Sequence, residues 1–257
     1  MFLEIDKTEK NMDIITTLED FVANLSSNYL FTLVQDMVKI FTRNWKLFLV
    51  EGLTATILLS LMTVFFGTIL GAAFALIKTS KIKPLKWLIN AIVEVVRGTP
   101  MLLQLYISTF LFPLFVPQLN DLSNKALICV SITLILNSGA YVSEIIRSGI
   151  EAVEKGQTEA ARSLGLTGTT TMIQIVLPQA VKNILPALGN EFITIIKETS
   201  LASTFYVGEL MTQYNKILGK SHNSLAILMI IGIIYFVLNF VLSKLLGILE
   251  RRMKSHA

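Results

Sequence analysis

The sequence predicts an all-α polytopic membrane protein with five transmembrane helices, its N-terminus outside and its C-terminus inside. Hydrophobic residues make up 53% of the 257 residues and charged residues only 16%. Several apolar runs reach the roughly 20 residues that a helix needs to cross a bilayer. The charges between those runs differ in sign from one connection to the next, which fixes the sides. This composition excludes an ordinary soluble domain, and with a net charge of only +4 we expect no nucleic-acid partner.

Cysteine and histidine give no sign of a metal or redox centre. Cys129 is the only cysteine, so the chain can form neither an internal disulfide nor a multi-cysteine metal site. His222 and His256 are too far apart in the sequence to suggest a ligand cluster. We also expect no secretory signal peptide, because no apolar core with a small-residue cleavage site follows the charged N-terminus. The sequence therefore predicts no metal-ligating and no catalytic residue.

Residues 1–48 form an N-terminal extension that cannot span a bilayer, because it holds seven acids and five bases. Within it, apolar residues recur at intervals of three and four, which is typical of an amphipathic helix. We interpret this helix as lying flat at the membrane interface; an element that binds a protein partner is the alternative. The apolar positions are Phe31, Val34, Val38, Phe41, Trp45 and Phe48.

Residues 49–250 form the predicted transmembrane domain, and Gly52 to Ile77 is its first span. This run is free of charge over 26 residues. Gly67 and Gly71 make a GxxxG step, which permits a second helix to approach closely. Four lysines and no acid follow the run, so the positive-inside rule places this turn in the cytoplasm and the N-terminus outside. The lysines are Lys78, Lys81, Lys83 and Lys86.

The second apolar region, Trp87 to Pro117, is broken in the middle by Gly98-Thr99-Pro100. Proline interrupts a helix, so we predict a single long, kinked span. Glu94 and Arg97 lie one helical turn apart just before the break. Together with Pro100 they are candidates for a gate, although an ion pair that only stabilises the kink explains them as well.

Three further spans complete the predicted domain. The third is Ala126 to Ile146, and the fifth, Leu225 to Leu249, carries Tyr235, Asn239 and Ser243 at every fourth position. That spacing places a narrow polar stripe toward the bundle. Residues 251–257 form a basic tail, which we expect inside.

The fourth span, Lys182 to about Phe205, is the most polar. An ionised side chain costs about 2.5–3.5 kcal/mol at mid-bilayer on insertion scales, and this helix carries three. It therefore lines a water-filled path for a solute or forms a buried network that holds the bundle together. The candidate path residues are Asn190, Glu191, Thr194, Lys197 and Glu198, with Tyr235 and Asn239 from the fifth span.

A polar segment separates the third and fourth spans, and its central stretch reads EAARSLGLTGTTTMIQIVLP from Glu159 to Pro178. Thr158 is suited to cap a helix, and Gly165 is suited to end it in a left-handed conformation. Ala160, Ala161 and Leu164 fall on one face of this short helix. A helix of one or two turns is marginal alone in water, so it lies against its own domain or against a partner.

The spacing of this segment resembles the cytoplasmic EAA loop of ABC-transporter permeases: EAA, a glycine at the fourth following residue, then I-x-L-P. RGTP and NEFITIIKETSLAS resemble segments of the permeases for polar amino acids such as histidine, glutamine, arginine and cystine. The resemblance covers residues 50–250 and implies a type I importer (MetI-like) fold with a coupling loop over 151–180. The coupling residues that it implies are Glu159, Ala160, Ala161, Leu164, Gly165 and Pro178.

The resemblance also implies partners and a location. A pair of ABC ATPase subunits holds the ATP and Mg²⁺, so no cofactor is expected in this chain and the chain is not an enzyme. A second permease copy or paralogue completes the path, and an extracellular amino-acid-binding protein delivers the substrate. The implied location is the bacterial plasma membrane, where the chain is a multi-pass protein in the lipid bilayer.

Two other classes of protein remain open from the residues alone. An ATP-independent channel or an ion-coupled transporter would use Glu191, Lys197 and Glu198 as ion or proton sites. A membrane-embedded enzyme would need a catalytic arrangement that the spacing of these three residues does not match.

Overall fold

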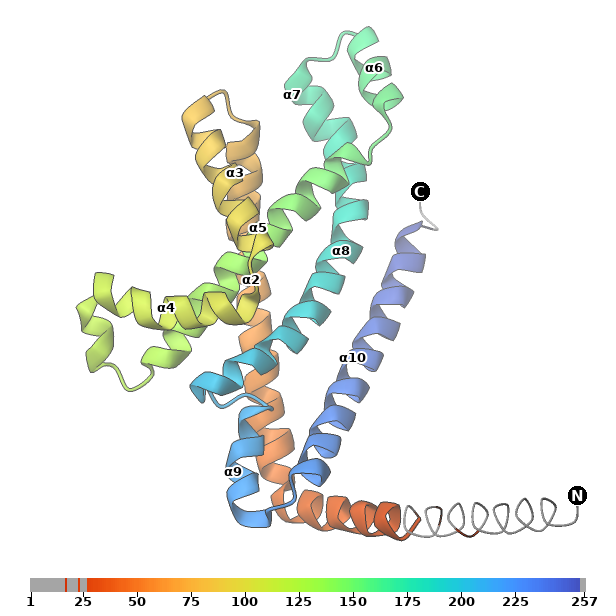
Figure 1. Ribbon diagram of the computed structural model, residues 1–257. Helices are drawn as coiled ribbons and strands as arrows, with labels where there is room; N and C mark the ends of the chain where they lie inside the picture. Colours follow the sequence, from red (N-terminus) through yellow and green to blue (C-terminus); the bar gives the residue numbers. More distant parts are fainter. Residues whose placement is uncertain (1–16, 18–22, 24–26, 255–257) are drawn as a thin grey trace, which may run out of the picture.

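The computed structural model describes residues 27–254 together with Thr17 and Ala23, and within these residues the secondary structure is helical without any strand. The all-α prediction is therefore confirmed (Figure 1). Residues 27–45 are α-helical and continue directly into the π-helical residues 46–52; we call residues 27–52 together the N-terminal helix. The elements after residue 45 are η1 (Lys46–Gly52), α2 (Leu53–Thr79), α3 (Lys83–Gly98), α4 (Met101–Phe115), η2 (Pro117–Asp121), α5 (Lys125–Glu151), α6 (Lys155–Ser163), α7 (Gly168–Thr171), η3 (Met172–Val176), α8 (Leu177–Glu198), η4 (Thr199–Phe205), α9 (Thr212–Ser221) and α10 (Ser224–Lys254).

Among the described residues, three helices are long and apolar enough to cross a membrane: Ser27–Thr79, Lys125–Glu151 and Ser224–Met253. The pair α3 and α4 passes the same test only if the two helices count as one span. α8 is not among them, because its charged residues lower its mean hydropathy, as the sequence anticipates. The predicted crossings by α2, α5 and α10 thus have helices of sufficient length, while the crossing by α8 stays a prediction.

The second apolar region breaks at Gly98-Thr99-Pro100 as predicted, and the break is much sharper than a kink; a single broken span stays a prediction. α3 and α4 make an angle of 115°, so α4 leaves the bundle sideways (Figure 1). The side chain of Gln104 holds this corner: its amide nitrogen donates to the carbonyl oxygens of Val96, at 2.6 Å, and Thr99, at 3.0 Å. These carbonyls have lost their helical partners at the end of α3, and Gln104 replaces those partners.

The GxxxG step lies where α2 crosses α5. A Cβ atom added at Gly67 would lie 2.7 Å from the hydroxyl oxygen of Ser138, and one added at Gly71 would lie 2.7 Å from Cβ of Val142. On α5, Gly139 meets Leu70 of α2 in the same way. The two helices therefore approach to a distance at which only glycine fits. The predicted close contact is confirmed, and α5 is its partner.

The molecule has two distinct ends (Figure 1). The turn between α2 and α3, which carries the predicted cytoplasmic lysines, lies at the same end as α6 and α7; we call this the α6 end. α9 and the N-terminal helix lie at the opposite end, which we call the α9 end. The resemblance to the EAA loop and the excess of lysines after the first span each predict a cytoplasmic side. The two segments concerned lie at the same end of the molecule.

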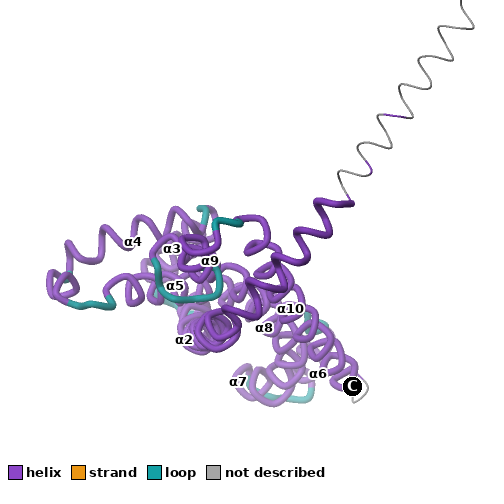
Figure 2. Tube along the Cα trace, turned by 90° about the horizontal axis from the view of Figure 1, so that it is seen from below, coloured by secondary structure: helices purple, strands orange, loops and turns teal. Residues whose placement is uncertain are grey.

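The N-terminal helix, whose last part is η1, continues into α2 without a break in helical structure, as Ser27–Thr79. It lies across the ends of α2 and α10 (Figures 1 and 2). Its buried residues Leu33, Ile40 and Phe48 join a core cluster with residues of α9 and α10. Asp36 also accepts a hydrogen bond of 2.9 Å from the side-chain amide of Asn223, at the start of α10. The rest of the predicted extension (1–16, 18–22 and 24–26) and the last part of the basic tail (255–257) lie outside the described residues.

Candidate functional site

The segment predicted to couple the chain to a partner forms α6, a helix of 9 residues that protrudes at the α6 end (Figure 1). It begins at Lys155, three residues before the predicted cap Thr158, which therefore lies inside the helix. The residue before the helix, Glu154, has an extended backbone (ψ 128°), and its carbonyl accepts the first turn's hydrogen bond from Gln157 at 3.0 Å. α6 is thus longer than the predicted one to two turns.

Gly165 ends α6 as the sequence predicts. Its φ is +85°, a left-handed value that favours glycine. The amide of Gly165 donates to the carbonyl of Arg162 at 3.0 Å, and the amide of Leu166 donates to that of Ala161 at 3.2 Å. These two bonds together form a Schellman motif, which satisfies carbonyls at the end of the helix. The end of α6 is therefore fixed by contacts within six residues of sequence.

The three apolar residues of α6 do not share one environment. Ala161 is only 5% exposed, because it packs against its own domain, whereas Leu164 is 84% exposed. Ala160, one turn before Leu164, is also exposed, and so is Glu159. The face available to a partner therefore includes Ala160 and Leu164, while Ala161 holds α6 in place.

Pro178 lies in the first turn of α8 and follows the π-helical turn η3 directly. A proline has no amide hydrogen to donate to the preceding turn, and its ring crowds the carbonyl four residues earlier. The wider η3 turn relieves that conflict, and such π-turns are frequent at functional sites. Pro178 therefore lies at the junction between the α6–α7 segment and α8, and because it is exposed, its predicted coupling contact stays a prediction.

The polar residues of α8 divide into two groups. Asn190, Thr194 and Lys197 are exposed on one face. Glu191 lies on another face and is only 8% exposed, and Glu198 is partly buried. The first group can contact solvent or another chain, and the second is directed toward the interior of this one.

The polar stripe of α10 is less uniform than predicted. The hydroxyl of Tyr235 donates to the carboxylate of Glu209 at 3.3 Å, and the amide of Asn239 donates to the carbonyl of Tyr235 at 2.8 Å. Ser243, by contrast, is exposed. Tyr235 therefore holds α10 to the segment before α9, and its place along a path stays a prediction.

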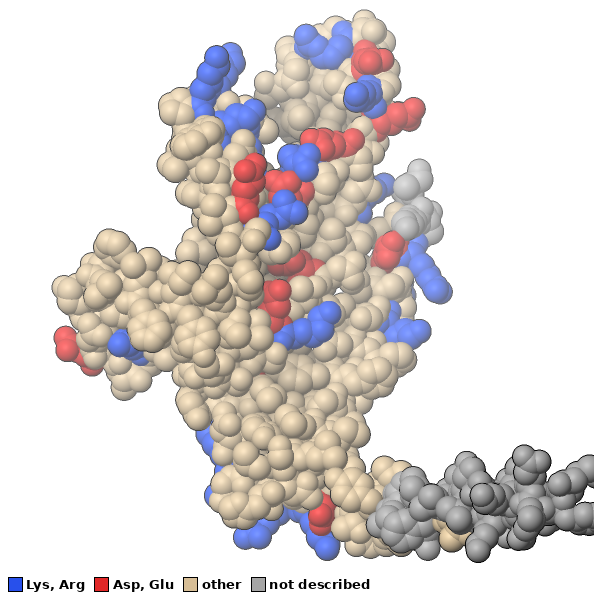
Figure 3. Space-filling view, viewed as in Figure 1, with Lys and Arg blue, Asp and Glu red and all other residues tan. Residues whose placement is uncertain are grey.

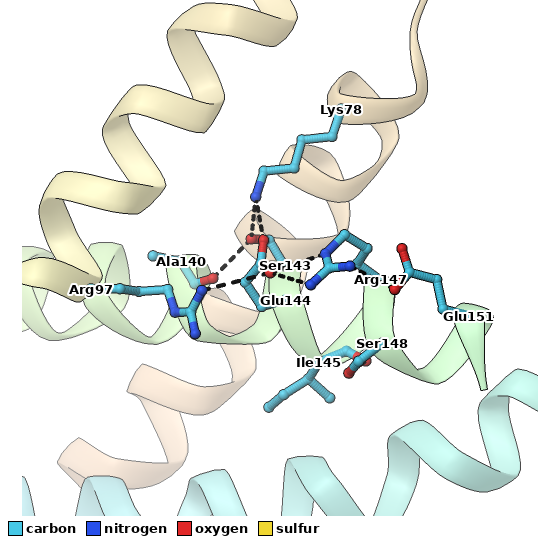
Figure 4. Close-up of polar contacts among 9 residues, drawn as sticks. All are labelled: Lys78, Arg97, Ala140, Ser143, Glu144, Ile145, Arg147, Ser148 and Glu151. Carbon is cyan, nitrogen blue, oxygen red and sulfur yellow. Dashed lines mark hydrogen bonds and ion pairs between the residues drawn. The ribbon is translucent and has the colours of Figure 1, made fainter.

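Sequence reasoning missed an ion cluster centred on Glu144 of α5 (Figure 4). Its carboxylate lies 2.7 Å from Nζ of Lys78 on α2, 2.9 Å from Nη2 of Arg147 on α5 and 3.6 Å from Nη1 of Arg97 on α3. Arg147 also pairs with Glu151 at 2.6 Å. The Glu144 carboxylate thus joins α2, α3 and α5 near the C-terminal end of α5, which leads into α6. The signal that could have found it is an acid three residues before Arg147 in a helix, with cations on both neighbouring spans.

The candidate gate residues Glu94, Arg97 and Pro100 do not form one unit. The carboxylate partner of Arg97 within the described residues is Glu144, and the guanidinium also lies 5.4 Å from the centre of the Tyr141 ring. Glu94 is exposed. Pro100 precedes α4 in an extended conformation, with ψ 135°. The predicted pair between Glu94 and Arg97 is therefore not formed, and Arg97 joins α3 to α5 instead.

Glu209 is a second residue that sequence reasoning missed. It is fully buried at 0% exposure. Its carboxylate accepts hydrogen bonds from the amides of Met211, at 2.6 Å, and Thr212, at 2.7 Å, besides the bond from Tyr235. Burial raises the pKa of the Glu209 carboxyl, and these hydrogen bonds oppose the rise. An acid that directly follows a glycine and lies three residues before the first residue of α9, Thr212, is the signal that could have been read.

The charged groups are unevenly distributed over the surface. Figure 3 shows Lys, Arg, Asp and Glu over the α6 end, along the middle of one face and at the α9 end, while the surface over α4 is almost uncharged. Among the described residues, no group of three or more His, Cys, Asp or Glu side chains could hold a metal ion. The chemistry of the site is therefore that of a polar surface and a protruding helix.

Comparisons with known proteins identify relatives over most of the chain. A family model described as "Binding-protein-dependent transport system inner membrane component" matches residues 63–255. The L-cystine transport system permease protein TcyB of Bacillus subtilis (strain 168) is 39% identical over 203 residues, which cover 79% of this chain and 85% of that protein. The arginine transport system permease protein ArtQ of the same organism is 39% identical over 209 residues, 81% of this chain and 94% of that protein.

Solved structures agree with the sequence relatives. A chain from a structure titled "Crystal structure of an amino acid ABC transporter with histidines" superposes with a TM-score of 0.77 at 40% identity, covering 82% of this chain and 96% of that one. A chain of the MetNI methionine ABC transporter in an inward-facing conformation has a TM-score of 0.64 at 17% identity, over 80% of this chain and 96% of that one. The second likeness shows the fold alone.

Proposed function

The chain belongs to the family of binding-protein-dependent transport system inner membrane components, and from this membership we propose that it is the permease subunit of an ATP-driven importer of polar amino acids. The relatives named for cystine and arginine support the class of substrate. The chain itself carries no catalytic step. Its role is to form part of a path through the plasma membrane of a bacterium and to couple that path to an ATPase.

The observation that carries this proposal is the exposure of Leu164, 84%, at the tip of the protruding helix α6. A large apolar side chain exposed to this degree on a polar helix is suited to enter a hydrophobic groove on a partner. Ala160, also exposed and one turn earlier, presents a small side chain that lets the partner's surface come close. α6 is therefore proposed to dock in a groove of a cytosolic ABC ATPase, one of a pair that binds ATP and Mg²⁺.

The connections of α6 give it a means to transmit movement. Three residues join it to α5, and α7 and η3 join it to α8. When the ATPase pair closes on ATP, α6 moves with it, and α5 and α8 move in turn. The bundle then changes between inward-open and outward-open states, a two-state equilibrium that ATP biases through its preference for one state.

α8 supplies the proposed path. Its exposed residues Asn190, Thr194 and Lys197 present hydroxyl, amide and ammonium groups, which suit a zwitterionic solute better than a lipid. A second permease copy or paralogue completes the path, and an extracellular amino-acid-binding protein delivers the solute at the α9 end. In this arrangement α8 is the additional crossing, with the α6 end in the cytosol.

The coupling role is tested by placing tryptophan at Ala160, on the docking face, and separately at Asn215, an exposed residue of α9. We expect Ala160→Trp to reduce co-purification of the ATPase and substrate-stimulated ATP hydrolysis at least tenfold, because a bulky group on this face holds the surfaces apart. Asn215→Trp should leave ATPase binding unchanged. Full ATPase binding by Ala160→Trp would overturn the proposal. Uptake that follows an ion gradient and needs no ATPase would establish the ATP-independent channel or ion-coupled transporter with Glu191, Lys197 and Glu198.

A further inference from the structure

The N-terminal helix lies outside the part of the chain that the family model matches, which begins at residue 63. The relatives named above cover 79% to 82% of the chain. Yet the described part of this helix is folded onto the bundle, through Leu33, Ile40 and Phe48. Its function is therefore a property of this chain that the comparisons do not supply.

The helix has three sectors with different surfaces. The first is the buried sector that packs on α9 and α10. The second is an exposed apolar sector that contains Phe31, Val34, Val38 and Trp45, with exposures from 45% to 67%. The third is a polar sector with the cations Lys39, Arg43 and Lys46, all exposed. At about 100° per residue these cations centre about 120° around the helix from the exposed apolar sector and lie opposite Phe41.

A groove separates the exposed apolar sector from α10. It has a volume of about 580 Å³, and every side chain that lines it is apolar, including Met37, Val38 and Phe41 from the N-terminal helix and Ile233 and Val237 from α10. α10 continues this surface with Phe236 and Phe240, which are 68% and 52% exposed. A surface of this kind on a spanning helix faces hydrocarbon chains.

The direction of the helix is fixed. The hydrogen bond from Asn223 to Asp36 and the burial of Phe48, at 0%, hold it across the ends of α2 and α10 (Figures 1 and 2). When α2 and α10 cross the membrane, a helix set across their ends lies in the plane of the interface. Its apolar sector then meets acyl chains, and its cations lie at the level of the lipid phosphates.

We infer that the N-terminal helix binds the lipid surface at the α9 end, with acyl chains in the groove beside α10 and anionic phospholipid headgroups at Lys39, Arg43 and Lys46. Within the described residues, neither Lys39 nor Arg43 forms an ion pair. A helix with basic residues on one face and aromatic and aliphatic residues on the other is the form that lies in a membrane interface. This inference rests on the proposed spanning of α2 and α10, but not on the docking of α6.

Trp45 serves as the reporter for the test. The chain has two tryptophans, so Trp87→Phe leaves Trp45 alone. The full-length variant is reconstituted in phosphatidylcholine bilayers that contain phosphatidylglycerol, with bromine on the acyl chains of one lipid or of the other. Bromine on the chains quenches tryptophan on contact, so the quenching ratio measures which lipid surrounds Trp45.

We expect chain-brominated lipid to quench Trp45, and phosphatidylglycerol to be enriched about fivefold there, the factor that corresponds to about 1 kcal/mol for one cation near an anionic surface. Lys39→Gln, Arg43→Gln and Lys46→Gln together should abolish the enrichment and retain the quenching. Lys81→Gln, Lys83→Gln and Lys86→Gln, which remove the same charge at the α6 end, should leave both unchanged.

Two results would overturn the inference. Equal quenching by the two lipids in the parent chain would show that the cations do not select headgroups. Absence of quenching would show that Trp45 contacts protein, either a second copy of this chain or the binding protein, rather than acyl chains. Because the docking of α6 is measured by ATPase binding, each of these results is distinguishable from a failure of the proposed function.

Discussion

At the α9 end an apolar cluster lies beside a fully buried carboxylate, whereas at the α6 end ion pairs with partly exposed side chains join the helices. Phe48, Leu210, Ile217 and Glu209 are all 0% exposed. In the Glu144 cluster, by contrast, the side chains of Lys78 and Glu144 are 11% and 19% exposed, and those of Arg97 and Arg147 are 42% and 50% exposed. Close packing has few alternative arrangements, whereas the pairs of Glu144 with the exposed Arg97 and Arg147 can exchange at little cost around the more buried pair with Lys78. The difference indicates a rigid frame at the α9 end and an adjustable linkage beside the coupling helix.

We expect the largest difference in stability between the two ends when one methyl group is added to a glycine at each end. A Cβ at Gly52 would lie 2.9 Å from the Cα of Leu210, a backbone atom that cannot move aside. Gly52→Ala should therefore destabilise the protein by about 1–3 kcal/mol. At Gly156 of α6 the nearest atom is a carboxylate oxygen of Glu154 at 3.9 Å, so Gly156→Ala should be neutral or stabilise by up to about 1 kcal/mol. Thermal unfolding in detergent measures the change in stability of both variants. Equal changes would contradict the difference in packing between the two ends.

Glu209→Gln examines the buried carboxylate of the α9 end. One carboxylate oxygen accepts from Met211 and Tyr235 and the other accepts from Thr212, so the amide leaves at least one backbone donor without an acceptor, at a cost of about 1–3 kcal/mol. Burial raises the pKa of Glu209, so the folded chain holds this proton to a higher pH than the unfolded chain does. The stability that this group contributes is complete below its unfolded pKa and is lost as the pH rises through its folded pKa.

Unfolding curves measured at a series of pH values test the predicted direction of this change in stability with pH. The parent chain should lose stability over that window, and Glu209→Gln should lose less. A parent chain that gains stability as the pH rises, by an amount that Glu209→Gln abolishes, would show that the hydrogen bonds outweigh burial at this carboxyl.

The ion pairs of the two ends offer a matched comparison. Glu144→Gln leaves Lys78, whose side chain is only 11% exposed, without its countercharge, and it should cost about 1–3 kcal/mol. Adding Lys78→Met should recover part of that loss, because the stranded charge is removed. Glu51→Gln breaks the pair with Lys216 at the α9 end, where both side chains are about half exposed, and should cost less than about 0.5 kcal/mol. Equal losses of stability in Glu144→Gln and Glu51→Gln would contradict the conclusion that Glu144 joins three helices.

The smallest effect is local to α6. Alanine at Gly165 must adopt the φ of +85°, which costs a residue with a side chain about 1–2 kcal/mol. Because only the Schellman bonds depend on it, amide hydrogen exchange should rise in α6 and remain unchanged in α9. An increase in both regions would mean that the end of α6 is not an independent unit.

What the sequence could predict follows from how far apart the contacting residues are in the chain. The break at Gly98-Thr99-Pro100 and the left-handed Gly165 are local, and both are correct. The partner of Arg97 is not local: Glu144 lies 47 positions later, so the sequence suggested the nearby Glu94 instead. The start of α6 was misjudged because Thr158 has the chemistry of a cap, while the extended backbone at Glu154 decides the actual boundary.

The same distinction explains the candidate path. The spacing of Asn190, Glu191, Thr194, Lys197 and Glu198 on a helix was readable from the sequence. Which of these residues face inward was not, because that depends on where α2 and α5 pack against α8. The fully buried Glu209 was missed because its burial depends on distant residues such as Tyr235, 26 positions later, which donates to it.

Thiol accessibility at Leu164 tests the central proposal most directly, because Cys129, the only native cysteine, is 0% exposed. Leu164→Cys should react with a maleimide in the chain purified alone and become protected at least tenfold in the complex with the ATPase. Asn215→Cys should react equally in both states. Equal labelling of Leu164→Cys with and without the ATPase would contradict the docking of α6 and the account of coupling with it.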